Sequence, residues 1–195
     1  MKKIAAVLVG LVVAGVASAA PIISWTWTDP NSAVHTYEAY SGEVTWNVAN
    51  TNATNLGGYL ATITSQAEQD ALVAAMSKID DGEYWLGGAQ PAQDNRVAGA
   101  AEDWYWTTGE EWCYECWQPG EPNEWNNTLE NHVGTWSDYG WNWNDEHKSA
   151  NIEGYIVEKG NLYAQCNVPE PGIMGLISLG LGLLGLARVR RSKRS

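Results

Sequence analysis

The sequence predicts a single domain with an α+β fold, and three observations support this. Two segments, 45–56 and 65–79, carry apolar residues at helical spacing. The stretch 108–141 is rich in Gly, Asn, Pro and Trp without sustained periodicity, which inside a domain indicates a long functional loop. Short runs of aromatic and aliphatic residues are typical of strands. These runs lie at 59–63, 84–88, 104–107 and 154–158.

The first predicted helix begins after Thr45, a residue type that caps helix N-termini. Gly57-Gly58 is expected to end it, because glycine readily adopts the backbone conformation that closes helices. Its apolar residues fall on one face, which we expect to be buried. They are Trp46, Ala49, Ala53 and Leu56.

The second predicted helix opens with a capping box at Ser65-Gln66-Ala67-Glu68. In a capping box the Ser and Glu side chains each accept a hydrogen bond from the other residue's backbone N–H. The apolar residues that follow at helical spacing predict the buried face. They are Ala67, Ala71, Leu72, Ala75, Met76 and Ile79.

Both ends of the chain are expected to be targeting segments. Residues 1–20 combine Lys2 and Lys3, a short apolar run and the small-residue sequence Ala17-Ser18-Ala19, which predicts a cleaved signal peptide and an exported protein. Residues 168–194 contain Pro-Glu-Pro, an apolar run and five basic residues. We expect a transmembrane helix at 172–189 with the basic cluster on the cytoplasmic side of the inner membrane.

Charge is distributed unevenly along the chain. Only four of the 11 basic residues but all 23 acidic residues lie in the stretch from Asp29 to Glu170, so this stretch has a formal charge of −19. A basic surface for nucleic acid is therefore excluded, and cations are attracted in general. The 12 Trp and 9 Tyr residues offer aromatic surface for a core and for stacking on sugar rings.

The segment from Trp117 to Asp145 contains side-chain oxygens suited to a hard cation. Ca²⁺ takes roughly 6–8 oxygen ligands at about 2.3–2.6 Å, whereas Zn²⁺ and Cu²⁺ prefer nitrogen and sulfur. Three carboxylates and two amides are the candidate calcium ligands. They are Glu121, Asn123, Glu130, Asn144 and Asp145.

Three short motifs, Glu121-Pro122-Asn123, Glu130-Asn131 and Trp143-Asn144-Asp145, resemble the sugar-binding calcium site of C-type lectin domains. The order of predicted elements in residues 33–160 is similar as well. The resemblance implies a C-type lectin-like fold, with two helices, small antiparallel sheets and a long loop that binds calcium and sugar. One Ca²⁺ would be completed by two vicinal sugar hydroxyls.

The resemblance also implies a role for each ligand. Glu121 and Glu130 would bind Ca²⁺ and accept hydrogen bonds from sugar hydroxyls. Asn123 and Asn144 would bind Ca²⁺ through their amide oxygens and donate to the sugar through their NH₂ groups. Asp145 would be a calcium ligand.

The loop between these motifs leaves some assignments open. The bond before Pro122 is expected to be cis by the same resemblance. The separation of Asn123 from Glu130 is about one residue longer than expected, so Glu124 or Asn131 could share the role given to Glu130. The indole of Trp125, another candidate carbohydrate-binding residue, either stacks on the sugar or belongs to the loop core.

Cysteine usage departs from the family. Its animal members use two disulfides, whose positions correspond here to Ala53 with Val157 and to His132 with Lys148. Cys113 and Cys116 are instead predicted to form a local disulfide, as expected of an exported protein. Cys166 would then be free or would link chains.

The C-terminal segment resembles the PEP-CTERM sorting signal of bacterial exported proteins. This implies an exosortase-type sorting enzyme as partner, removal of the tail, and delivery to the cell surface or an extracellular matrix. A plain membrane anchor is the alternative. The expected organisation is a signal peptide at 1–20, the C-type lectin-like domain at 33–160, a linker at 161–167 and the sorting segment at 168–194.

Three classes of function are considered. The first is calcium-dependent binding of a polysaccharide, and the second is an adhesion or scaffold domain of the same fold that binds no sugar. An enzyme is disfavoured, because a glycosidase needs one carboxyl with a raised pKa, whereas carboxylates that share a calcium ion stay ionised.

Overall fold

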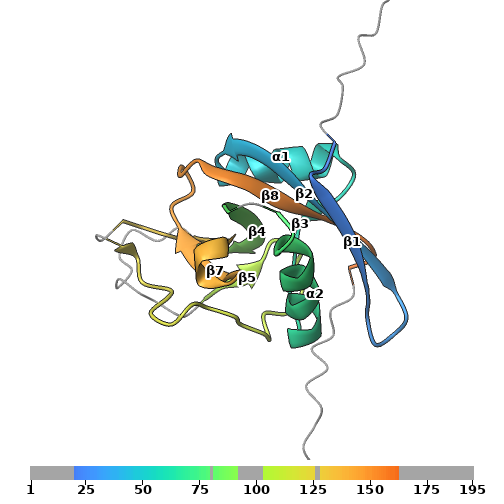
Figure 1. Ribbon diagram of the computed structural model, residues 1–195. Helices are drawn as coiled ribbons and strands as arrows, with labels where there is room; N and C mark the ends of the chain where they lie inside the picture. The colour runs from blue at the N-terminus through green and yellow to red at the C-terminus, as the bar shows by residue number, and fades with distance from the viewer. Residues whose placement is uncertain (1–19, 80, 92–102, 126–127, 163–195) are drawn as a thin grey trace, which may run out of the picture.

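The computed structural model describes residues 20–79, 81–91, 103–125 and 128–162. These residues form two helices and a mixed eight-stranded sheet with the path β1-β2-β8-β4-β6-β7, in which β3 pairs with β8 and β5 with β4. Figure 1 shows the long connection after β5 on the opposite side of the molecule from β1. The α+β prediction is therefore confirmed, with the difference that β4 and β8 pair in parallel.

The elements follow one another along the chain with these bounds. They are β1 (Ile23–Thr28), β2 (Val34–Val44), α1 (Trp46–Asn55), β3 (Tyr59–Leu60), α2 (Gln66–Met76), β4 (Glu83–Ala89), β5 (Tyr105–Trp106), β6 (His132–Trp136), the 3₁₀ turn η2 (Ser137–Tyr139), β7 (Asn142–Glu146) and β8 (Ile152–Lys159). Residues 1–19 of the predicted signal peptide and the whole predicted sorting segment lie outside the described residues.

Helix α1 follows its prediction closely. Trp46, Ala49 and Ala53 are buried, and Gly57 has the left-handed φ of 79° that was expected at the end of the helix. Ala53 packs in the same apolar cluster as Val157, so hydrophobic contact occupies the place where animal relatives of the resembled family have a disulfide. Trp46 Nε1 also donates to the Leu86 carbonyl oxygen of β4 at 3.0 Å.

Helix α2 forms only half of the predicted capping box. Ser65 Oγ accepts from the Glu68 backbone N–H at 3.2 Å. The Glu68 carboxylate does not complete the box, because it accepts instead from the Thr64 backbone N–H at 2.7 Å and from the Tyr37 hydroxyl. Glu68 thus joins α2 to β2 through a buried polar contact.

The predicted buried face of α2 is partly wrong. Leu72, Ala75 and Met76 are buried, but Ala67 is exposed and the polar residue Gln69 lies inside. Gln69 is accommodated because its amide is paired: Nε2 donates to the Trp141 carbonyl at 2.8 Å, and Oε1 accepts from Trp143 Nε1 at 3.1 Å. A buried amide with satisfied hydrogen bonds replaces an apolar residue that periodicity alone would require.

Four strands match none of the predicted runs, and one was predicted too long. These are strands β1, β2, β6 and β7, and β3 ends at Leu60 where the sequence indicated Ile63. Strand β1 lies ahead of the expected domain start at residue 33 and pairs antiparallel with β2. Because β6 begins at His132, the long loop is also shorter than the predicted 108–141.

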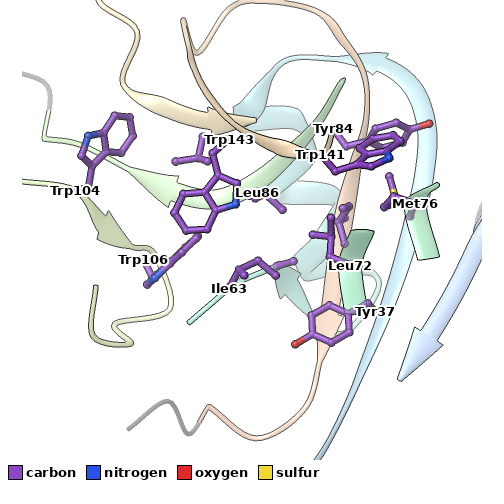
Figure 2. Packing of buried hydrophobic residues seen from close by; sticks show 14 residues of the cluster. Tyr37, Ile63, Leu72, Met76, Tyr84, Leu86, Trp104, Trp106, Trp141 and Trp143 are labelled. Atoms are coloured by element: carbon purple, nitrogen blue, oxygen red, sulfur yellow. The ribbon is translucent and has the colours of Figure 1, made fainter. Parts of the chain in front are cut away.

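The largest core cluster joins the sheet to α2 and to the long loop. Figure 2 shows Trp104, Trp106 and Trp143 at one end of this cluster. The Trp106 and Trp143 rings meet edge to face with centroids 5.5 Å apart, an arrangement favoured by aromatic quadrupoles. This contact joins β5, after which the long loop begins, to β7.

The two helix N-termini offer a matched stability test. Ser65→Ala removes a side-chain cap from α2 and is expected to lower the free energy of unfolding by about 1 kcal/mol. Thr45→Ala is the control, because within the described part of the chain the Thr45 side chain makes no cap hydrogen bond. Urea denaturation measures both, and equal losses in the two variants would show that the Ser65 cap does not stabilise α2.

Candidate functional site

The candidate site lies where the long loop meets strand β7. Trp143 of β7 forms a parallel bridge with Trp117, its N–H donates to the Cys116 carbonyl at 2.7 Å, and its carbonyl accepts from Gln118 N–H at 2.9 Å. On its other side β7 pairs with β6, with Asn144 opposite Gly134. Strand β7 therefore places Asn144 and Asp145 directly beside the loop.

Asp145 holds the loop by its backbone. Its carboxylate, 1% exposed, accepts from Asn123 N–H at 2.9 and 3.1 Å and from Glu124 N–H at 3.0 Å. Glu124 is buried and has a left-handed φ of 47°, and the Glu121–Pro122 bond is cis, as the resemblance implied. One side chain of β7 thus fixes the turn that presents Glu121 and Asn123.

Glu130 closes the far end of this turn. Its Oε2 accepts from Trp125 N–H at 2.5 Å, and the side chain is buried. Burial raises the pKa of Glu130 to about 7, the hydrogen bond from Trp125 opposes this, and the charge of Asp145 adds to the rise. Glu130 is therefore an acidic group kept close to other acidic groups.

Glu121 and Asn123 each have a buried side-chain oxygen without a hydrogen-bond partner in the described part of the chain. Glu121 Oε1 accepts from Tyr139 OH at 3.5 Å, but Glu121 Oε2 and Asn123 Oδ1 are buried without a hydrogen-bond partner among the described residues. Burial, followed by the neighbouring carboxyl of Asp145, raises the pKa of Glu121 to about 7. Buried oxygens of this kind are stabilised by a cation or a hydrogen-bond donor.

The side-chain NH₂ group of Asn144 is engaged within the protein. Asn144 Nδ2 donates to Glu83 Oε1 at 3.2 Å and to Glu146 Oε1 at 3.1 Å. The expectation that this NH₂ group donates to a sugar therefore differs from the structure, where both of its hydrogens have carboxylate acceptors. Burial raises the pKa of Glu83 to about 8 and also raises that of Glu146.

The remaining loop residues bear on two open assignments. The Trp125 side chain is 68% exposed, so the alternative that it belongs to the loop core is wrong. Asn131 lies directly before β6, where its carbonyl accepts from Gln90 N–H at 2.9 Å. Of Glu130 and Asn131, it is Glu130 whose side chain contacts the Asn123–Trp125 turn.

The five candidate ligands are oxygen donors of the type that a hard cation binds, but their side chains are not grouped around one centre. Among the described residues, no three His, Cys, Asp or Glu side chains are grouped so that they could hold a metal ion. The oxygens nevertheless include two without partners, and neighbouring carboxyls add to the raised pKa values of Glu121 and Glu130. The residues thus fit Ca²⁺ chemically.

The predicted Cys113–Cys116 disulfide is wrong. Cys116 is a free thiol that donates to Asn142 Oδ1 at 3.2 Å, whereas Cys113 is disulfide-bonded and its sulfur lies 3.8 Å from the Thr64 carbonyl oxygen. The loop carries the two side chains to different neighbours, one on β7 and one before α2. A Cys-x-x-Cys spacing permits a local bridge only where the backbone turns between the two residues.

The C-terminal end of the chain matches a known sorting motif. Residues 167–191 match the model of the PEP-CTERM protein-sorting motif. Among the described residues no helix is long and apolar enough to cross a membrane, and the predicted transmembrane helix at 172–189 lies outside them.

Curated relatives match the central part of the chain. Halomucin from Haloquadratum walsbyi is 35% identical over 66% of this chain but only 1% of halomucin. Ladderlectin from Oncorhynchus mykiss is 29% identical over 64% of this chain and 62% of ladderlectin. A perlucin-like protein from Mytilus galloprovincialis is 30% identical, covering 57% of this chain and 67% of that protein. The matched segment thus spans less than two thirds of halomucin and of ladderlectin.

Two solved structures share the fold. The cow CD23 C-type carbohydrate-recognition domain, crystallised in the presence of an oligosaccharide, is 25% identical with a TM-score of 0.54, covering 70% of this chain and 98% of that domain. A calcium-independent type II antifreeze protein is 27% identical with a TM-score of 0.50, covering 65% of this chain and 86% of that protein. Similar folds therefore occur with different ligands.

Proposed function

This chain belongs to the C-type lectin-like family and carries a PEP-CTERM sorting motif, and on that premise we propose that it is an exported, calcium-dependent polysaccharide-binding protein. The binding domain comprises residues 33–160. An exosortase-type enzyme recognises the C-terminal segment at the inner membrane, after which the domain resides at the cell surface or in an extracellular matrix. A catalytic role forms no part of the proposal.

The observation that carries this proposal is the pair of buried, unpartnered oxygens on Glu121 and Asn123, beside the Asp145 carboxylate. A cation there would offset both the missing hydrogen bonds and the repulsion between carboxyls. The residues that would hold Ca²⁺ are Glu121, Asn123, Glu130, Asn144 and Asp145. When bound, the ion supplies a positive centre to which sugar hydroxyls coordinate.

The side chains around the ion would orient the sugar. Glu121 and Glu130 accept hydrogen bonds from hydroxyls, and the NH₂ group of Asn123 donates one. The exposed indole of Trp125 offers a face for the apolar side of a pyranose ring. Support also comes from the cow CD23 domain, whose structure was determined in the presence of an oligosaccharide.

Calorimetric titration of calcium into the purified chain tests the proposal. We expect one saturable site at moderate salt, lost in Glu121→Gln/Asn144→Ala. Glu115→Gln is the control, because it removes one carboxylate from an exposed position of the same loop. Weak binding that salt screens equally in all three proteins would contradict a specific site.

A second candidate is an adhesion or scaffold domain that binds no sugar. The similarity to a calcium-independent antifreeze protein favours it, as does the lack of a grouped metal-binding set among the described residues. A glycan array with and without a calcium chelator separates the candidates. Calcium-dependent glycan signals support the lectin, and their absence under both conditions supports the scaffold.

A further inference from the structure

Two carboxylates outside the recognised motifs hold the Asn144 side chain. Glu83 Oε1 and Glu146 Oε1 accept from Asn144 Nδ2 at 3.2 and 3.1 Å. A side-chain amide has two N–H donors, and each of these carboxyl oxygens accepts one hydrogen bond, so both hydrogens are used. The amide oxygen takes no part in either contact.

The contact from Glu83 crosses an entire strand. Glu83 belongs to β4 and Asn144 to β7, and β6 lies between them in the sheet. Gly134 of β6 stands opposite Asn144 and leaves room for the crossing: a Cβ added there would lie 2.6 Å from Glu83 Oε1 and 3.2 Å from its Cγ and Cδ. Any larger residue at position 134 would displace the Glu83 carboxylate.

The Glu83 side chain is itself held in place. It is 6% exposed, and its backbone N–H donates to Glu153 Oε2 at 2.9 Å. A buried side chain anchored beside its own backbone can orient its neighbour more firmly than an exposed one, because fewer rotamers are open to it.

We infer that Glu83, reaching across Gly134, and Glu146 position Asn144 as a ligand that offers only its oxygen. This inference rests on the proposed function, in which Asn144 binds Ca²⁺. It also narrows sugar recognition: a hydroxyl beside Asn144 receives no hydrogen bond from it. Of the two amide ligands, Asn123 is then the one that donates to the sugar.

Two Glu83 variants distinguish positioning from an effect of the acidic group. Glu83→Gln removes the acidic group but keeps an acceptor oxygen, whereas Glu83→Leu removes both. Loss of the contact to a metal ligand typically lowers metal affinity 10–100-fold, so we expect a fall of about that size in Glu83→Leu. Glu83→Gln should restore the affinity to within about threefold of the parent, because a neutral acceptor still holds the amide. Equal losses of calcium affinity in both variants would overturn positioning in favour of a requirement for the acidic group itself.

A second measurement is made without calcium and so does not depend on the proposed function. In the calcium-free protein, the ¹H–¹⁵N signals of the Asn144 side chain report whether its NH₂ group is engaged. We expect solvent exchange at least about tenfold faster in Glu83→Leu and in Gly134→Ala, which displaces the carboxylate without removing it. Exchange unchanged in both variants would overturn the inference. If the parent binds no calcium but its amide responds as expected, the positioning stands and the proposed function fails.

Discussion

Replacing Glu158 with alanine is expected to lower the free energy of unfolding by about 3–5 kcal/mol. Glu158 is 1% exposed on β8, a strand inside the sheet. Its carboxylate accepts from His35 Nδ1 at 2.7 Å, from Tyr59 OH at 3.0 Å and from Thr62 N–H at 3.0 Å. The substitution leaves these buried donors without their acceptor, and unpaired buried groups lose their full solvation free energy.

The neighbouring residue provides the control. Lys159 pairs with Glu38 at 2.7 Å in a partly exposed ion pair, so Lys159→Ala should lower the free energy of unfolding by only about 0.2–1 kcal/mol. Urea denaturation of both variants at one pH measures the contrast. Similar losses from the two adjacent positions would show that the buried network around Glu158 is not a major source of stability.

The same network predicts how stability changes with pH. The hydrogen bond to Glu158 raises the pKa of His35, so the stabilisation is complete below about 6.5 and is lost as pH rises through the folded-state pKa. Burial, then the charge of Glu158, raises the pKa of Glu68 from 4.5 to about 7, so the folded state holds an extra proton between these values. Both effects make the parent less stable as pH rises from about 5 to 8. Glu158→Ala should remove the contribution of His35 to this pH dependence of the free energy of unfolding.

The second large expected effect is a fall in calcium affinity on acidification. Glu121 and Glu130 have pKa values of about 7 in the cation-free protein, raised first by burial. Metal ligands bind deprotonated, so the ion must displace protons at lower pH. One unit below its pKa a carboxyl is about nine-tenths protonated, so the apparent affinity should fall about tenfold for each group, or about 100-fold together, from pH 8 to pH 6.

Calorimetry in two buffers of different ionisation enthalpy measures this proton release directly. Glu121→Gln should release fewer protons and show a shallower pH dependence, because one titrating ligand has been removed. Calcium affinity that stays constant between pH 6 and 8 would exclude carboxylate coordination as the basis of binding. Retention of a bound sugar at about pH 4 would exclude it as well.

The proposed binding of calcium would also be linked to the stability of the domain. Without a cation, the raised pKa values of Glu121 and Glu130 mean that the folded state loses stability as pH rises from 4.5 to about 7. An ion that binds only the folded state adds stability in proportion to the logarithm of its concentration over its dissociation constant. The benefit of calcium to folding should therefore be largest at and above neutral pH.

Local patterns in the sequence predicted those parts of the protein that depend on neighbouring residues. The C-type lectin-like fold is confirmed, helix α1 ends at its glycines, and the cis bond precedes Pro122. Each depends on a few consecutive residues or on a motif. The same reasoning missed Glu83, because its contact with Asn144 joins residues 61 positions apart and leaves no local pattern.

The failed predictions have a shared physical cause. Strand β2 buries His35, and α2 buries Glu68 and Gln69, polar residues that a hydrophobic pattern assigns to the surface. Their burial depends on partners contributed by segments distant in the sequence, chiefly Glu158, Tyr37 and Trp141. The cysteine prediction failed in the same way, since spacing alone does not show that Cys113 and Cys116 face different neighbours.

The hydrogen bond from Trp125 N–H to Glu130 Oε2 has a consequence for protein engineering. It closes a short chain segment whose two ends are each tied to the body of the domain, one through Asp145 and one through β6. The free energy of closing a loop rises only slowly with its length. Foreign peptides inserted between Trp125 and Glu130 should therefore be displayed beside the proposed glycan site while the flanking side chains keep their places.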